Sequence, residues 1–137
     1  MTQHFNIAVI GSGPGGYVAA LKAAQMGAKT AVIERHPFFG GTCLNVGCIP
    51  SKALIASAEL ADHIRHAADF GLKVSGEVGV DWPAIQRRKD TVIKKLRGGI
   101  KGLFGARGVT AFQGRAVLDG PGRIAVTREG AEAELVT

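Results

Sequence analysis

The most constraining feature of the sequence is the order of segments between residues 5 and 34. A short apolar run, Phe5 to Ile10, is followed by a glycine-rich turn, and the alanine-rich segment Gly13 to Met26 has the composition of a helix that packs closely. Gly27 then ends that helix, and Lys29 to Glu34 is a second apolar run. We therefore expect a βαβ unit with two parallel strands.

The turn after the first expected strand has a pattern that is typical of dinucleotide sites. Gly11-Ser12-Gly13-Pro14-Gly15-Gly16 fits G-x-G-x-x-G. Gly11 permits a tight turn, Gly13 lets a pyrophosphate approach the backbone, and Gly16 lets the helix pack closely on the strand. The loop, with Pro14 and Gly15, would place phosphates at a helix N-terminus, whose free N–H groups favour anions.

Glu34 completes this pattern at the end of the second expected strand, eighteen residues after Gly16. A carboxylate at this position accepts hydrogen bonds from an adenosine ribose and disfavours a 2′-phosphate. The alternative is a simple turn, but the strand, helix, second strand and acid all favour a dinucleotide. The pattern alone does not separate FAD from NAD, because both contain ADP. A second loose match at residues 120–125 precedes a strand pattern, and we interpret it as a hairpin turn.

The two cysteines, Cys43 and Cys48, lie five residues apart in a glycine-rich stretch that runs to Lys52. Residues five apart on a regular helix have a Cα separation of roughly 8.6 Å, whereas a disulfide needs less than about 7 Å. If the two are joined, the first helical turn must be distorted, which Gly47 permits and which makes the bond easier to reduce. We expect the following helix, beginning near Pro50, to point its N-terminus toward Cys48 and favour its thiolate.

Two other interpretations of the cysteines stay open at this point. They could be unrelated buried residues, since free cysteine is often a small core residue. They could also bind a metal, but a tetrahedral site needs two more ligands and His36 is the only nearby histidine. Redox chemistry is therefore favoured, and no metal is expected.

The formal net charge of +6 raises the question of an anionic partner. Residues 85–107 hold eight of the seventeen Lys and Arg residues and a single acid, Asp90, while the rest of the chain has nine basic and ten acidic residues. The apolar residues of this segment fall at helical spacing, which predicts an amphipathic helix with a solvated basic face: Ile85, Val92, Ile93, Leu96, Ile100, Leu103 and Phe104. Without aromatic platforms, we expect neither nucleic-acid nor membrane binding.

The remaining segments complete the predicted fold. Residues 51–68 have helical spacing, and residues 109–118 and 123–127 have strand patterns on either side of a turn-rich linker, with a third strand beginning near Glu132. The fold class is therefore α/β: a Rossmann-like βαβ unit with a parallel sheet, two further helices and a C-terminal antiparallel β-meander. No targeting segment or apolar stretch near eighteen residues is seen, which predicts a cytoplasmic protein.

Together these residues resemble a known family. Gly41-Thr42-Cys43 through Lys52, with the fingerprint and Glu34, is similar to the pyridine nucleotide–disulfide oxidoreductases, the class that includes lipoamide dehydrogenase, glutathione reductase and mercuric reductase. Within this class, the sequence C-L-N-V-G-C-I-P-S-K-A-L is most similar to that of the lipoamide dehydrogenases. The similarity continues through the basic helix and into residues 114–117, so it spans essentially the whole chain.

The resemblance implies a cofactor and roles for single residues. FAD would bind here and NAD in a later domain. Cys43 would be the thiol that exchanges with the substrate disulfide, and Cys48 the thiol beside the flavin. Lys52 would be a cation near flavin N5, a role that we favour over the alternative of a surface lysine in the first turn of the helix. Residues from Glu34 to Cys43 would line the cofactor, and these include Arg35, Gly41 and Thr42. Ala116 matches a backbone contact to adenine where the family often has Gly.

The resemblance also implies parts that this sequence lacks. The family's base is a His-x-x-x-x-Glu pair from the partner subunit, and none of the four histidines has Glu five residues later. We expect residues 1–137 to be the N-terminal part of an FAD-binding domain, with the redox loop at 40–52 and the NAD-binding and dimerisation domains absent. The implied parent is a homodimer that oxidises dihydrolipoamide, free or on the lipoyl domain of a 2-oxoacid dehydrogenase complex, with NAD⁺. A mercuric or glutathione reductase-type enzyme and a non-catalytic nucleotide-binding module are the alternatives.

Overall fold

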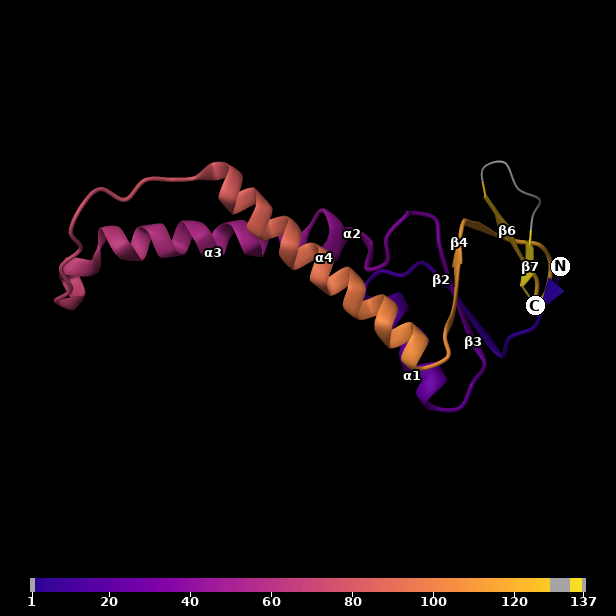
Figure 1. Cartoon of the computed structure of the whole chain (residues 1–137). Helices are drawn as coiled ribbons and strands as arrows, with labels where there is room; N and C mark the ends of the chain where they lie inside the picture. Colours follow the sequence, from indigo (N-terminus) through magenta and orange to yellow (C-terminus); the bar gives the residue numbers. More distant parts are fainter. Residues whose placement is uncertain (1, 129–133, 137) are drawn as a thin grey trace.

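The structure is a computed structural model that describes residues 2–128 and 134–136. Figure 1 shows two small sheets at one end of the molecule and long helices that lead away from them. The first sheet is parallel, in the order β2 (Ile7–Ile10), β3 (Thr30–Glu34) and β4 (Thr110–Gln113). Helix α1 (Pro14–Gln25) connects β2 to β3, so the predicted βαβ unit is confirmed.

Strand β3 lies at the centre of this sheet, and all five of its residues are buried. Its side chains alternate between the two faces, as strand geometry requires. Val32 packs with residues from α1 and α4, while Ala31 and Ile33 pack with Phe112 and Val126 on the other face. The parallel sheet is therefore covered on both sides, by helices on one and by the second sheet on the other.

The second sheet has the order β1 (Thr2–Gln3), β7 (Glu134–Val136), β6 (Ile124–Thr127) and β5 (Arg115–Leu118). Its β5–β6–β7 part is antiparallel, which confirms the predicted meander and its hairpin. Strand β1 was not predicted, and it pairs with β7 in parallel. The third strand begins at Glu134, and the predicted start at Glu132 lies outside the described residues.

The prediction of a single strand over residues 109–118 was wrong. Gly114 separates β4 from β5, which belong to different sheets. Its φ of +154° is a conformation that favours glycine, and a Cβ there would lie 2.7 Å from the Thr127 carbonyl oxygen. The chain therefore crosses between the sheets at a residue that has no side chain.

Three helices join the strands on the other side of the molecule. Helix α2 (Gly41–Asn45) is a single turn, α3 (Cys48–Arg65) follows it after two residues, and a 3₁₀ turn, η1 (Ala67–Phe70), continues α3. Helix α4 (Trp82–Ala106) is the predicted basic helix, which begins earlier than expected because Asp81 accepts a 2.9 Å hydrogen bond from the Ala84 N–H.

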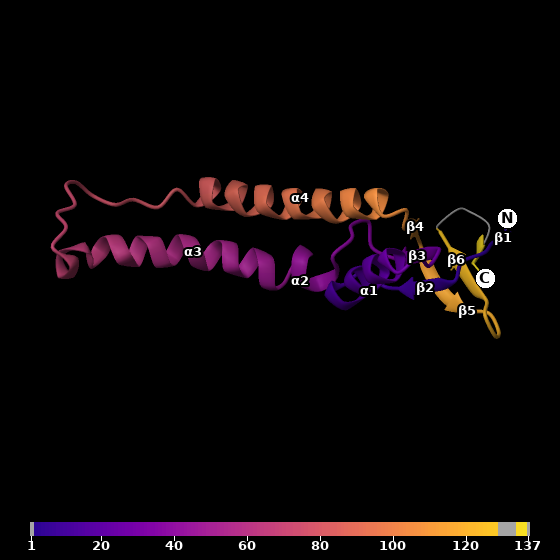
Figure 2. The same cartoon turned by 90° about the horizontal axis from the view of Figure 1, so that it is seen from below.

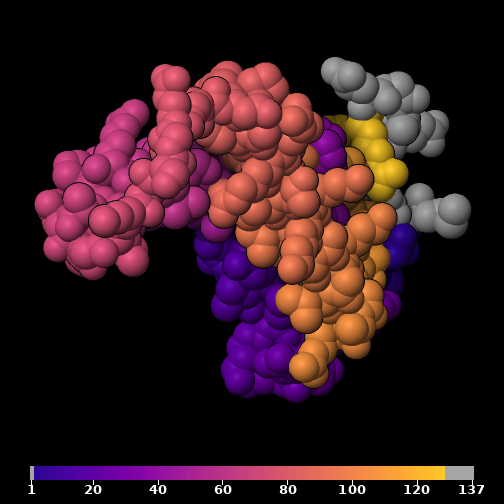
Figure 3. Space-filling view, turned by 60° about the vertical axis from the view of Figure 1, so that its left-hand side comes forward, coloured from indigo at the N-terminus to yellow at the C-terminus, as the bar shows by residue number. Residues whose placement is uncertain are grey.

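Helices α3 and α4 lie side by side and extend away from the sheets (Figure 2). In Figure 3 the far part of this hairpin, in magenta, projects as a separate lobe. The apolar stripe predicted for α4 is only partly buried: Ile93, Ile100 and Phe104 are in the core, whereas Leu96 and Leu103 are 39% and 47% exposed. The buried face of α4 is therefore narrower than its apolar pattern.

Candidate functional site

The glycine loop between β2 and α1 has the close backbone packing that its pattern predicts. Gly11 has a φ of +91°, and its N–H donates to the Ile33 carbonyl at 2.7 Å. A Cβ on Gly16 would lie 1.9 Å from the Gly11 carbonyl oxygen, so no side chain fits there. Helix α1 begins after Gly13, and no side chain caps it. Its first N–H groups are therefore available to an anion, and the loop fits a pyrophosphate.

Glu34 is 95% buried and is held beside this loop by three hydrogen bonds. The Ser12 hydroxyl and N–H both donate to Oε2, at 2.6 and 3.0 Å, and the His36 N–H donates to Oε1 at 2.9 Å. Burial raises the pKa of Glu34, but the hydrogen bonds from His36 and Ser12 and the charge of His36 outweigh it, so the pKa is lowered overall. The carboxylate therefore stays ionised, with Oε1 free to accept a second hydrogen bond.

A pocket of about 270 Å³ brings together residues that are far apart in the sequence. Four of its lining residues were predicted as cofactor contacts: Gly11, Glu34, Arg35 and Ala116. Gly114 and Arg115 line the same pocket and were not predicted from the sequence. The structure places Ala116 beside the end of β3 because the chain crosses from β4 to β5 there, and the Gly114 N–H donates to the Glu34 carbonyl at 2.8 Å.

The loop after β3 brings the cysteine segment, residues 40–48, against the glycine loop. The Gly40 N–H is 3.0 Å from the Ser12 carbonyl and 3.3 Å from its Oγ. A Cβ on Gly41 would lie 2.6 Å from the Gly13 Cα, so the start of α2 touches the dinucleotide fingerprint. The predicted nucleotide residues and the predicted redox segment are therefore neighbours in the fold.

Cys43 and Cys48 lie on two different helices, which confirms that one regular helix does not hold them both. Helix α2 ends at Asn45, and α3 begins at Cys48. Between them, Gly47 approaches α2 so closely that a Cβ would lie 3.0 Å from the Thr42 carbonyl oxygen and 3.2 Å from the Cys43 Cα. Gly47 thus permits the distorted connection for steric reasons, as expected.

Both cysteines are free thiols, and Cys43 is half-buried whereas Cys48 is exposed. The pKa of Cys43 is raised by hydrogen bonding to the Cys48 side chain, by burial and by the charge of Cys48, while the N–H groups of Cys48 and Ile49 partly offset the rise. Cys48 is the first residue of α3, and the N–H groups of Cys48 and Ile49 also act on the Cys43 thiol, so the expected effect of the helix end on the Cys48 thiolate stays a prediction. Helix α3 begins at Cys48 itself, two residues before Pro50.

Lys52 and Thr42 flank the cysteine pair at the surface. Lys52 is in the first turns of α3 and exposed, and within the described part of the chain it makes no hydrogen bond or ion pair. Thr42 is exposed one residue before the half-buried Cys43. The structure thus leaves both side chains accessible to a ligand and assigns neither a structural partner.

Several residues that hold this site together were not predicted from the sequence. Arg97 of α4 donates to the Asn45 Oδ1 at 2.5 Å and stacks on Phe38, 3.7 Å from the ring centroid. Gln113 of β4 donates to the carbonyls of Glu34 and His36. Ser12 could have been found from the sequence, because it is a small polar residue inside the glycine loop and its side chain is within reach of the Glu34 carboxylate. No sequence signal links Arg97 to a residue 52 positions away.

None of the helices in residues 2–128 is both long and apolar enough to span a bilayer. In the described ranges, no three His, Cys, Asp or Glu side chains come together as metal ligands.

Comparison with known proteins now identifies the family. The family model for pyridine nucleotide-disulphide oxidoreductases matches residues 5–134. The dihydrolipoyl dehydrogenase of Chlamydia muridarum is 54% identical over 118 residues, which are 86% of this chain and 25% of that protein. The Acholeplasma laidlawii dihydrolipoyl dehydrogenase is 42% identical over 99% of this chain and 40% of its own length. The mitochondrial dihydrolipoyl dehydrogenase 1 of Arabidopsis thaliana is 48% identical over 88% of this chain and 24% of its length.

The chain thus spans between 24% and 40% of the length of these relatives. The family match extends over both the glycine loop and the cysteine segment, the two features that the structure brings into contact. The chain belongs to the pyridine nucleotide-disulphide oxidoreductase family.

Proposed function

We propose that residues 1–137 form the N-terminal part of the FAD-binding domain of a longer dihydrolipoyl dehydrogenase. The observation that supports this most is a contact between two segments of the chain. The glycine loop, whose backbone fits a pyrophosphate, touches the one-turn helix that carries Cys43. The relatives support the choice within the family, because the three described above are named dihydrolipoyl dehydrogenase. The NAD-binding and dimerisation domains would follow in the longer protein.

The residues present fit FAD in two respects. The uncapped α1 N-terminus would hold the pyrophosphate through backbone N–H groups of Gly15 and Gly16. The pocket of about 270 Å³ would hold the adenosine, with the Glu34 Oε1 toward the ribose and Ala116 near the base. Thr42, Cys48 and the Lys52 ammonium would lie along the flavin half. When bound, FAD would accept an electron pair from the dithiol and deliver it to NAD⁺.

The cysteine pair would carry out the exchange with substrate. A dihydrolipoamide thiolate attacks the Cys43 sulfur of the oxidised pair, the Cys43–Cys48 bond breaks, and Cys48 leaves as a thiolate. The second substrate thiol then attacks the mixed disulfide, so lipoamide forms and Cys43 is released. The substrate has lost two electrons and two protons, and the pair has gained the two electrons. The raised pKa of Cys43 would keep one of the two protons on that sulfur, and the base supplied by the partner subunit would take the other.

The test is an assay of the full-length protein with dihydrolipoamide and NAD⁺, following NADH. We expect turnover in the wild type and none in Cys43→Ser or Cys48→Ser variants. Disulfide reduction driven by NADPH, without NADH formation from dihydrolipoamide, would favour a glutathione or mercuric reductase-type enzyme. Nucleotide binding without any turnover would favour a non-catalytic module.

The partners and compartment belong to the same proposal. The protein would be a homodimer, whose partner subunit supplies the missing base, and would act on lipoyl domains of 2-oxoacid dehydrogenase complexes. The bacterial relatives support a cytoplasmic location, whereas the Arabidopsis relative is named mitochondrial. Fractionation of the native host would decide between the two compartments.

A further inference from the structure

Two arginines of α4 reach the two helices that carry the cysteines. The Arg97 Nε donates to the Asn45 side chain in α2 at 2.5 Å, and the Arg88 Nη1 donates to the Ala53 carbonyl in α3 at 2.9 Å. These contacts join residues that are 52 and 35 positions apart in the sequence. Helix α4 is therefore bonded separately to the Cys43 helix and to the Cys48 helix.

Arg97 makes the more extensive of the two attachments. The Asn45 amide nitrogen donates back to the carbonyls of Gly41 at 2.7 Å and Phe39 at 3.2 Å, and Arg97 fixes that amide through its oxygen. The Arg97 guanidinium also stacks on Phe38 at 3.7 Å. Because it contacts the chain on both sides of Cys43, Arg97 holds a one-turn helix that would not be stable by itself.

We propose that Arg97 is a positioning residue that, with Arg88 as a second attachment, sets the approach of Cys43 to Cys48 and so favours their disulfide. This rests on the redox role proposed above. Residues 88 and 97 are nine positions apart on one helix, a rise of about 13.5 Å. A rigid helix that binds α2 at one point and α3 at another fixes the separation of the two sulfurs in advance, so less order is lost when the bond forms.

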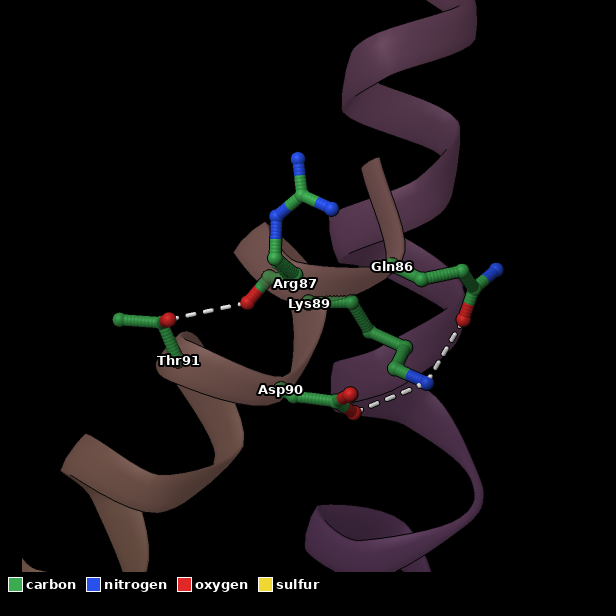
Figure 4. Close-up of polar contacts among 5 residues, drawn as sticks. All are labelled: Gln86, Arg87, Lys89, Asp90 and Thr91. Carbon is green, nitrogen blue, oxygen red and sulfur yellow. Dashed lines mark hydrogen bonds and ion pairs between the residues drawn. The ribbon is translucent and has the colours of Figure 1, made fainter. Parts of the chain in front are cut away.

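The same helix provides a matched control, which Figure 4 shows. The Lys89 ammonium is 2.9 Å from the Gln86 side-chain oxygen and 3.0 Å from the Asp90 carboxylate, and both partners lie on α4 itself. The neighbouring bond from the Thr91 hydroxyl to the Arg87 carbonyl also stays within α4. Replacing Lys89 by Met therefore removes a cation next to Arg88 without removing an attachment to α2 or α3.

The experiment measures how readily the pair closes in the full-length protein. Wild type, Arg97→Met, Arg97→Lys, Arg88→Met and Lys89→Met are equilibrated with mixtures of reduced and oxidised glutathione, quenched with acid and alkylated. Mass spectrometry of the peptides then gives the fraction of Cys43–Cys48 disulfide. Each closure takes two protons and two electrons from the thiols, and glutathione disulfide accepts them to become two glutathione molecules.

We expect Arg97→Met to lower the equilibrium constant for closure about tenfold, which corresponds to about 30 mV. Arg97→Lys keeps a donor and a cation and should recover most of this loss. Arg88→Met should lower the constant about threefold, and Lys89→Met should leave it within twofold of wild type. Far-UV circular dichroism identifies any variant that has unfolded, and Arg97→Gln then replaces Arg97→Met, with a loss of at least threefold expected.

Equal closure in Arg97→Met and Lys89→Met would overturn the inference, and so would a loss in Arg97→Met that Arg97→Lys does not recover. A wild type that forms no Cys43–Cys48 disulfide at any glutathione ratio would contradict the proposed function as well. Normal closure in every variant would contradict only the role of Arg97 and leave the redox pair intact.

Discussion

The glycine loop at residues 11–16 and the cysteine segment at residues 40–48 touch each other but are stabilised in different ways. The loop is fixed by contacts within the βαβ unit, such as the Gly16 approach to the Gly11 carbonyl and the Ser12 bonds to Glu34. The cysteine segment depends on Arg97, which lies far away in the sequence. One site is thus built locally, whereas the other is completed by a distant helix.

The two kinds of stabilisation suit two different functions. A site that binds phosphate through backbone N–H groups needs rigid main-chain geometry, which glycines and short-range bonds provide. A pair of sulfurs that forms and breaks a bond has to keep its spacing in both states, and side chains on a separate rigid element can hold that spacing. The following predictions test how strictly the two regions are separated in this way.

The largest effect is expected for Gly16→Ala in the glycine loop. The added methyl group would lie 1.9 Å from the Gly11 carbonyl oxygen, so backbone must move. We expect the free energy of unfolding to fall by about 3 kcal/mol, together with loss of bound flavin from the full-length protein. Chemical denaturation and flavin absorbance measure the two effects, and an unchanged flavin content would show that the loop tolerates the shift.

A smaller, pH-dependent loss is expected for Glu34→Gln. At pH 7 the change replaces a carboxylate that accepts three hydrogen bonds, so we expect the free energy of unfolding to fall by about 2 kcal/mol. The pKa of Glu34 is lowered in the fold from its usual 4.5, so the ionised form stabilises the protein above that pH and the benefit disappears as the pH falls through the lowered value. Denaturation midpoints of wild type and variant should converge on acidification. A difference that stays constant from pH 7 to pH 3 would contradict this.

In the cysteine segment, Gly47→Ala should lower the free energy of unfolding by less than Glu34→Gln does. Its Cβ would lie 3.0 Å from the Thr42 carbonyl oxygen, so a displacement of a few tenths of an ångström suffices, and we expect a loss of about 1 kcal/mol. Disulfide formation in a glutathione buffer should weaken in parallel. Gly79→Ala is the control, because a Cβ there meets nothing within 4 Å. Normal closure in Gly47→Ala would mean that the connection between α2 and α3 is looser than its packing indicates.

The smallest change is expected in α4, where Gly98→Ala should stabilise the protein by about 0.5–1 kcal/mol. Gly98 is inside the helix, and its Cβ would have open space around it. A stiffer α4 should leave both sites intact, so thermal unfolding should shift upward without a change in disulfide formation. A destabilised variant would instead indicate that another part of the full-length protein packs against this glycine.

The local contacts of the glycine loop explain why the sequence predicted its backbone geometry well. The glycine spacing, the strand before it and the acid at the end of β3 all lie within thirty residues, and each reflects a backbone requirement of its own. The meander was predicted for the same reason, since its turn residues lie between the paired strands. Ser12 was missed because its partner, Glu34, was considered only as a ligand for ribose.

For the cysteine segment, the redox role stays a prediction, and the local structure was not predicted from the sequence. Its glycines suggested a loop, and no periodicity marks a one-turn helix such as α2, because five residues are too few to show a repeat. The attachment by Arg97 and the change of sheet at Gly114 are tertiary, and a single sequence does not encode such contacts as a local pattern. Arg97 therefore looked like one more cation on a basic helix face.

The bond from the Gly40 N–H to Ser12 and the contact of Gly41 with Gly13 join the two sites at their backbones. Because these contacts are directly between backbones, a displacement of one site also displaces the other. Under the proposed function, a chain that has not yet bound FAD would hold the Cys43 helix less firmly, so binding of the cofactor at the glycine loop would also order the thiols.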